Sequence, residues 1–118
     1  MPGQQTQELL QLADPPTAIF AGNDAQAAGA YQALYQQNIR IPDEMSVIGF
    51  DDVMYTAQMP PPLTTIHQPL LEMGRVAANM LLRQIAGSPL DSNHVELSTS
   101  LVIRQSCTAP RQGKITLR

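Results

Sequence analysis

Polar side chains that could bind a small hydroxylated ligand follow two short apolar runs of this chain. Residues 17–30 read TAIFAGNDAQAAGA and residues 46–52 read SVIGFDD, so each run ends in amide or carboxylate side chains. The amide of Asn23 can both donate and accept hydrogen bonds, and the carboxylate of Asp51 can accept two hydroxyl donors. These residue types suit a receptor for a small molecule, and nothing in the chain indicates a complete enzyme.

Catalytic and metal-binding chemistry finds less support. Asp24, Asp51 and Asp52 could in principle hold Mg²⁺ for phosphoryl transfer, but no glycine-rich phosphate-binding loop follows either run. His67 and His94 are far apart and have no partner at metal-ligand spacing. We therefore predict no catalytic residue, no metal and no cofactor. A small α/β enzyme that uses the aspartates is a third, less favoured interpretation.

A strand–helix–strand unit would bring the polar side chains together. Residues 18–22 and 47–50 are predicted strands, and residues 25–37 are a predicted helix with apolar residues at helical spacing. The strands of such a βαβ unit are parallel, and their crossover is right-handed. Ligands of open parallel sheets bind outside the carboxyl ends of the strands. The pattern thus predicts an α/β fold in which Asn23 and Asp51 share one rim.

The remaining elements are predicted from the same kinds of pattern. Residues 4–13 end an amphipathic helix, and residues 63–66 are a third apolar run. Residues 69–86 form a long helix, and residues 95–103 form a strand or a bent strand pair. The inward-facing stripe of the long helix is Leu70, Met73, Ala77, Met80, Leu81 and Ile85. Residues 109–118 are a loose tail.

Composition limits the partners of the chain. Its 118 residues are 43% apolar and 14% charged, with a net charge of −3 and no cluster of Lys or Arg. This balance argues against direct binding of nucleic acid, which rests on basic surfaces. The single cysteine, Cys107, cannot form an internal disulfide, which fits a reducing compartment. With neither an export signal nor a membrane span in the sequence, we expect a cytoplasmic protein.

Four sequence blocks taken together are far more specific for a protein family than any one of them. They are PTAIFAGNDAQAAGA, RIPDEMSVIGFDD, PPLTTIHQPLLEMGRVAANMLLRQIAG and VELSTSLVIRQSCTAP. In order and spacing they resemble the C-terminal part of the LacI/GalR family of bacterial transcriptional regulators. The resemblance implies a partial periplasmic-binding-protein-like (type I) fold, with residues 1–108 as a partial effector-binding and dimerisation domain that includes the crossover helix 69–86. It further implies a homodimer, a sugar-like effector, and operator binding only through a helix-turn-helix headpiece that the chain lacks.

The resemblance also assigns roles at the two strand ends. It implies that Asn23 contacts the effector and leaves Asp24 as the helix cap, although a cap at Asn23 is the plain alternative. Asp51 becomes the strongest ligand contact. Asp52 is interpreted as a turn residue.

Three further ligand contacts follow from the resemblance alone. Gln68, Leu70 and Met73 match positions where the chain crosses between lobes beside the ligand. Relatives often carry an aromatic residue at the position of Leu70. Leucine at this position therefore leaves the identity of the effector open. For Leu70 and Met73, packing of an amphipathic helix is the alternative interpretation.

The expected dimer surface combines the alanine-rich helix with residues 55–62. Ala27, Ala28, Tyr31 and Met59 are its predicted contacts. The alternatives are an exposed helix face of high helix propensity and an ordinary exposed methionine.

A fragment of a periplasmic sugar-binding protein from a transport system is the alternative function. It would share the strand–helix–strand pattern. The segments LTTIHQP and LVIRQSCTAP favour the regulator.

Overall fold

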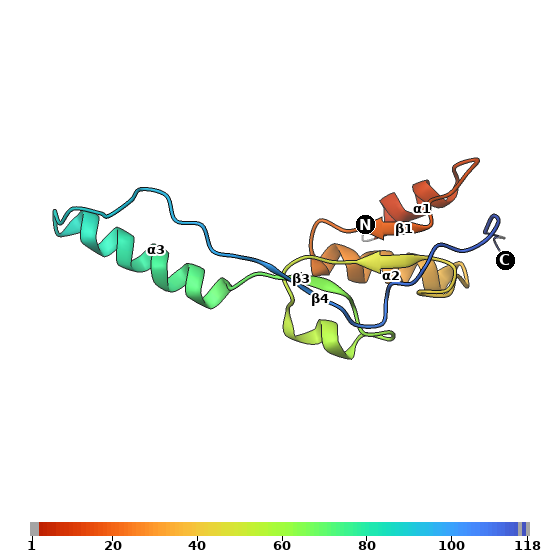
Figure 1. Cartoon of the computed structure of the whole chain (residues 1–118). Coiled ribbons are helices and arrows are strands. Elements are labelled where there is room, and N and C mark those ends of the chain that lie inside the picture. The colour runs from red at the N-terminus through yellow and green to blue at the C-terminus, as the bar shows by residue number, and fades with distance from the viewer. Residues whose placement is uncertain (1–2, 116, 118) are drawn as a thin grey trace.

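The computed structural model describes residues 3–115 and residue 117. Figure 1 shows a body of short strands and helices from which one long helix extends. In chain order the elements are α1 (Gln4–Leu10), β1 (Ala18–Phe20), α2 (Asp24–Gln36), β2 (Ser46–Ile48), the 3-10 helix η1 (Met54–Gln58), β3 (Thr65–His67), α3 (Leu70–Ile85) and β4 (Ser100–Val102).

The predicted βαβ unit is present. Strands β1 and β2 pair in parallel with Ile19 opposite Val47, and α2 forms the crossover between them. Strands β3 and β4 form a second, antiparallel pair with Ile66 opposite Leu101. A parallel bridge between Ile48 and Thr64 joins the two pairs. The strands are shorter than predicted, but these pairings connect all four of them.

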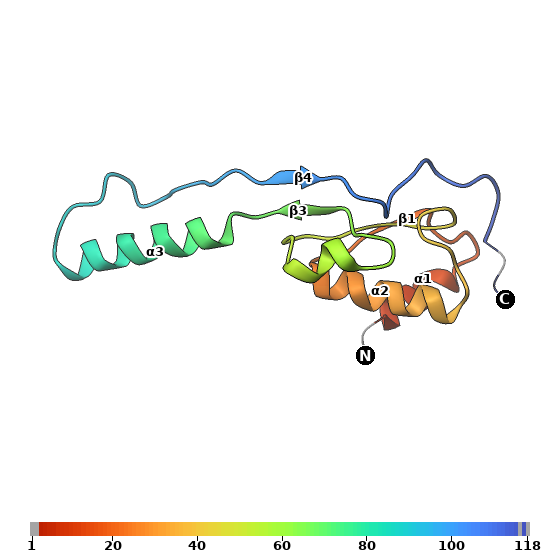
Figure 2. The same ribbon diagram turned by 90° about the horizontal axis from the view of Figure 1, so that it is seen from below.

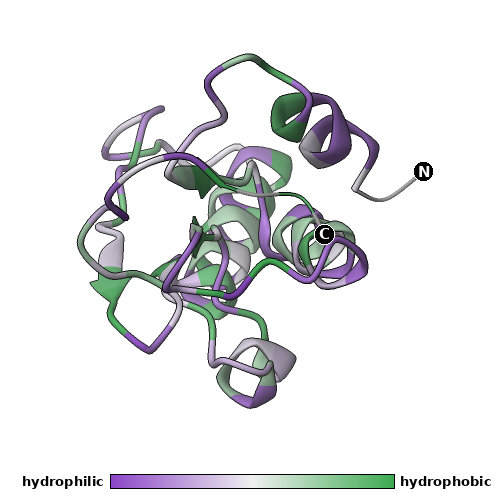
Figure 3. Ribbon diagram, turned by 90° about the vertical axis from the view of Figure 1, so that its right-hand side faces the viewer, coloured by the Kyte–Doolittle hydropathy of each residue, from purple (hydrophilic) through white to green (hydrophobic). Residues whose placement is uncertain are grey.

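The core lies between α2 and the strands. Ala27 and Leu34 of α2 are fully buried together with Met45, Val47 and Leu63. Small residues on α2 allow this close approach of the helix to the strands. Figure 3 views the molecule end-on and shows hydrophobic and hydrophilic residues alternating along the ribbons, as expected for elements that each bury one face.

Helix α3 extends away from this body. The molecule measures 62 × 25 × 21 Å, and its radius of gyration is 18.7 Å, whereas about 13 Å is typical for a compact domain of this length. Figure 2 shows α3 and the returning chain side by side, joined to the body through β3 and β4. No residue of α3 is buried. The prediction that its apolar stripe faces inward is therefore wrong within this chain: Ile85 of the stripe is 74% exposed.

Among the described residues, no helix is both long and apolar enough to cross a membrane. Helix α3 has 16 residues and carries charged side chains at Glu72, Arg75 and Arg83. Its apolar stripe is thus one face of an amphipathic helix.

Two residues of the C-terminal stretch 109–118, which is predicted to be loose, contact the body. The guanidinium of Arg111 donates hydrogen bonds of 2.9 Å to the carbonyl oxygens of Pro16 and Glu44. Ile115 packs against the core. Residues 109–115 form no helix or strand, so the loose tail stays a prediction, and residues 116 and 118 lie outside the described part of the chain.

Gly49 offers a test of how closely the body is packed. A Cβ added there would overlap the carboxylate of Asp24 and the side chain of Leu63. We expect Gly49→Ala to lower the free energy of unfolding by about 1–3 kcal/mol, as measured by urea denaturation. The control is Gly74→Ala in α3, where a Cβ meets nothing within 4 Å and where alanine should stabilise the helix by up to about 1 kcal/mol. Equal effects of the two changes would contradict close packing at Gly49.

Candidate functional site

Asn23 and Asp51 lie at the same edge of the sheet. Each follows one strand of the parallel pair, after β1 and after β2. The backbone N–H of Asp24 donates to the carbonyl oxygen of Phe50 at 2.9 Å, which ties the two strand ends together. The rim predicted from the sequence is therefore present in the fold.

Asn23 is the cap of α2. Its Oδ1 accepts a 2.8 Å hydrogen bond from the backbone N–H of Gln26, and its backbone is extended. The assignment of the cap to Asp24 is therefore wrong: Asp24 is already the first helical residue. Capping uses only the amide oxygen of Asn23. Among the described residues no partner engages its Nδ2, which is left as a hydrogen-bond donor at the rim.

Asp24 is instead a buried residue that connects the elements around the site. It is 1% exposed. Its Oδ1 accepts from the hydroxyl of Thr65 at 2.6 Å, and its Oδ2 accepts from the backbone N–H of Val53 at 2.9 Å. The carboxylate also lies in the first turn of α2, where the helix dipole stabilises negative charge. One buried side chain thus joins α2, β3 and the turn after β2, a role that no local sequence pattern indicates.

Asp51 is held in an unfavourable backbone conformation. Its φ is 124°, a region that L-residues rarely occupy and that is common at ligand sites. Its backbone N–H donates to Ile66 O at 2.9 Å, and its Oδ1 accepts from Nε2 of Gln68 at 2.6 Å. The structure thus brings together two of the predicted ligand residues. Among the described residues no hydrogen-bond partner engages Asp51 Oδ2.

Leu70 and Met73 lie in the first turn of α3 and are exposed. Met73 lines a hollow of about 370 Å³ with Gln68, between α3 and the returning chain, and Leu70 does not line it. Asn23 lines a different hollow of about 580 Å³ beside β1. Neither of these two hollows is lined by all five predicted ligand residues.

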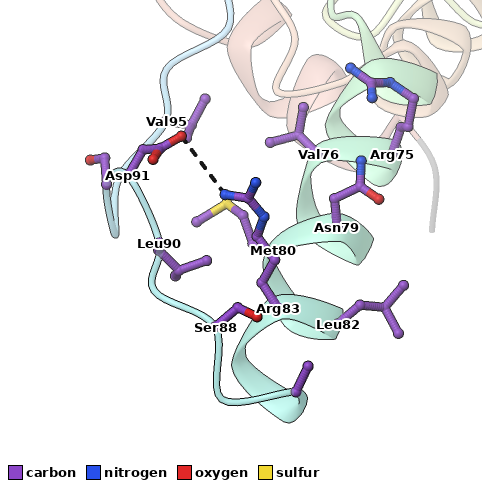
Figure 4. A pocket seen from close by; sticks show the side chains of 12 residues that line it. Arg75, Val76, Asn79, Met80, Leu82, Arg83, Ser88, Leu90, Asp91 and Val95 are labelled. Carbon is purple, nitrogen blue, oxygen red and sulfur yellow. Dashed lines mark ion pairs between the residues drawn. The ribbon is translucent and has the colours of Figure 1, made fainter.

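Another hollow, of about 640 Å³, lies away from the rim. Figure 4 shows it between α3 and the segment that follows, with Met80 and Leu90 among its apolar walls. Arg83 Nη1 and Asp91 Oδ2 form an ion pair across it at 3.8 Å. No predicted ligand residue lines this hollow.

The predicted dimer residues divide into two groups. Ala27 is fully buried in the core, and Tyr31 is nearly so, donating its hydroxyl to the carbonyl oxygen of Pro61 at 2.8 Å. Ala28 and Met59 are half-buried. Tyr31, Ala28 and Met59 line a hollow of about 490 Å³ on the outer face of α2 together with Tyr35. Ala27 contributes to the core beneath that face rather than to the face itself.

Asp52 is more than the turn residue predicted. Its Oδ1 accepts from Nη2 of Arg104 at 2.7 Å, and its Oδ2 lies 2.9 Å from Nδ1 of His67. Burial alone would raise the pKa of Asp52, but the hydrogen bonds from Arg104 and His67 lower it below its ordinary value. No local sequence pattern indicates a role for Arg104, because its partner lies 52 positions away.

His94 and Cys107, the other side chains considered for chemistry, lie at the surface. Nε2 of His94 lies 3.0 Å from Oε1 of Glu96, and both side chains are exposed. Cys107 is an exposed free thiol. Among the described residues, no group of three or more His, Cys, Asp or Glu side chains could hold a metal ion.

Comparison with known proteins identifies the family. The model of the periplasmic binding protein-like domain matches residues 2–107. The ribose operon repressor of Escherichia coli (strain K12) is 45% identical over 91 residues, which are 77% of this chain and 28% of the repressor. The transcriptional repressor CytR of the same strain is 42% identical over 103 residues, 87% of this chain and 30% of CytR.

Solved structures of LacI-family regulators have a similar fold. The lac repressor dimer bound to operator and the anti-inducer ONPF matches 91% of this chain with 37% of its own, at 34% identity and a TM-score of 0.81. A LacI-family regulator from Lactobacillus casei with bound sucrose matches 86% of this chain with 38% of its own, at 33% identity and a TM-score of 0.71.

These relatives are regulators rather than enzymes or transport proteins. The chain spans 28–30% of the length of the two curated repressors. The chain belongs to the family of periplasmic binding protein-like domains, and its counterpart there is the C-terminal effector-binding part of LacI/GalR-type transcriptional regulators.

Proposed function

We propose that this chain is the effector-binding and dimerisation part of a LacI/GalR-type regulator, and that its effector is a sugar or a related small metabolite. The observation that carries the proposal is the conformation of Asp51. Its φ of 124° and its hydrogen bond from Gln68 fix a carboxylate at the rim where Asn23 also lies. A related regulator binds sucrose, and the polar groups at this rim suit the hydroxyls of such a ligand.

In the proposed complex Asp51 and Asn23 bind the ligand in different ways. Asp51 accepts hydrogen bonds from ligand hydroxyls, and its negative charge strengthens those bonds. Asn23 donates from Nδ2 while its Oδ1 continues to cap α2. The chain carries a net charge of −3, so we assign operator binding to a headpiece outside these 118 residues. Regulation then requires that the ligand binds the operator-competent and operator-released states with different affinity.

The isolated chain is expected to bind sugars only weakly. Because Asn23 and Gln68 line separate, open hollows, the 118 residues supply only one wall of the proposed cleft. Titration calorimetry of the chain with D-ribose, sucrose and cellobiose should give no dissociation constant tighter than about 1 mM, which corresponds to about −4 kcal/mol. Micromolar binding of any of these sugars would contradict the incomplete site.

A hybrid protein tests the site itself. Residues 17–107 of this chain replace the matching segment of the E. coli ribose operon repressor, and sugar binding is measured by calorimetry. Asp51→Asn should weaken binding roughly thirtyfold, because it removes charge-assisted hydrogen bonds worth about 2 kcal/mol.

The matched control is Asp43→Asn, at an exposed position before the amino end of β2. This change should leave the affinity unaltered. If the folded hybrid binds none of the three sugars, or if both substitutions weaken binding equally, the proposed role of Asp51 is refuted.

We also propose that the outer face of α2 forms the dimer contact. Ala28, Tyr31, Tyr35 and Met59 line a shallow, mostly apolar hollow there. A two-fold interface brings the same patch of both subunits together, and a small residue such as Ala28 within it allows two helices to approach closely. The match to the lac repressor dimer supports this assembly.

Ala28→Glu in the hybrid tests the dimer face. A carboxylate at the centre of an apolar interface would be buried without a partner, which typically costs several kcal/mol. Size-exclusion chromatography with light scattering should therefore show the mass of a monomer. Ala13→Glu, an equal change at an exposed loop position, should leave the dimer intact. A dimer that persists in Ala28→Glu would exclude this face.

A further inference from the structure

Two neighbouring residues of the turn after β2 pair with two neighbouring residues at the end of β3. Gln68 donates to Asp51, and His67 contacts Asp52, at 2.6 and 2.9 Å. Both aspartates have positive φ, 124° and 63°, and such conformations cost about 1–3 kcal/mol each. They persist only where surrounding contacts hold them, so something must hold this turn.

Arg104, which follows β4, provides contacts of the required kind. Its Nη2 donates to Asp52 Oδ1 at 2.7 Å, and its Nη1 donates to Thr56 Oγ1 and to the carbonyl oxygen of Leu63, both at 2.9 Å. Its backbone N–H donates to Thr64 Oγ1 at 2.9 Å. One planar guanidinium with donors in fixed directions thus joins the turn after β2, η1 and the segment that leads into β3.

The surroundings make this ion pair stronger than a surface pair. The side chains of Arg104 and Asp52 are 20% and 17% exposed. Thr56 beneath them is fully buried and donates its hydroxyl to the carbonyl oxygen of Val53 at 2.7 Å. Removing one partner of a partly buried, hydrogen-bonded pair leaves the other charge without compensation, whereas exposed pairs contribute little.

We propose that Arg104 and Asp52 are positioning residues: their ion pair holds the turn after β2 in its left-handed conformation and thereby sets where Asp51 presents its carboxylate. Its effect on ligand binding rests on the proposed function, but its effect on the turn does not. Lysine at position 104 would keep the charge without the fork that reaches Asp52, Thr56 and Leu63 together.

Hydrogen exchange of the 118-residue chain, followed by NMR, tests the effect on the turn. The amide of Asp51, which donates to Ile66, reports on the turn, and the amide of Ala21, which donates to Ile48, reports on the body. Arg104→Gln should accelerate exchange at Asp51 at least tenfold and at Ala21 less than twofold.

The matched control is Arg83→Gln, whose partner Asp91 is 3.8 Å away and fully exposed. It should change neither amide. Equal acceleration of the Asp51 and Ala21 amides by Arg104→Gln would mean that the pair only stabilises the fold, and an unchanged Asp51 amide would mean that the pair does not hold the turn. Either result overturns the proposal.

The titration of Asp52 separates a positioning charge from a merely structural side chain. Burial raises the pKa of this carboxyl, and Arg104 and His67 lower it below its ordinary value. Arg104→Gln should raise the measured pKa of Asp52. Arg104→Lys should give a pKa between those of the unsubstituted chain and of Arg104→Gln. If Arg104→Gln does not fold, Asp52→Asn replaces it and should accelerate exchange at the Asp51 amide in the same way. An unchanged Asp52 pKa in Arg104→Gln would mean that Arg104 does not stabilise the Asp52 carboxylate, and it would overturn the proposal.

The hybrid repressor connects the turn to the ligand. There Arg104→Gln should weaken sugar binding about tenfold. A faster Asp51 amide with unchanged affinity would overturn the positioning role in binding while leaving the proposed function intact. A hybrid that binds no sugar even without substitution would refute the proposed function, and the exchange experiment would still decide whether Arg104 holds the turn.

Discussion

The parallel pairing of β1 with β2 is the constraint on which the rest of the structure depends. A parallel pair needs a crossover, and here the crossover is α2, whose buried Ala27 and Leu34 pack over Val47. Parallel strands also bring their carboxyl ends to one edge. As a result Asn23 can serve two purposes: its amide oxygen caps α2, and its amide nitrogen lies at the same rim as Asp51.

A buried carboxylate fixes that edge. Asp24 has a donor for each of its oxygens, the hydroxyl of Thr65 and the backbone N–H of Val53. A buried charge is tolerated when its hydrogen bonds are satisfied and a helix N-terminus is near. Gly49 leaves the space that this carboxylate occupies. The rim is therefore supported from below by contacts between three elements, so its strained residues do not depend on loop structure alone.

The sequence predicts what local patterns determine. The common edge of Asn23 and Asp51 follows from one βαβ unit, and the amphipathic stripe of α3 follows from its periodicity. The sequence cannot show which of two adjacent residues, Asn23 or Asp24, takes the cap, because both side chains can accept from the helix. It also cannot pair Asp52 with Arg104, 52 positions away. Periodicity identifies an apolar face on α3, but not whether its partner lies in the same chain.

The connection between the body and α3 joins these observations. Strands β3 and β4 run side by side where α3 and the returning chain leave the body. Asp51 meets Gln68 at that point, and Asp52 meets His67 and Arg104 one residue further on. A ligand that binds Asp51 would therefore act within one residue of the contacts that anchor both connecting strands. Asp52 thus joins the turn after β2 to both strands that lead to and from α3.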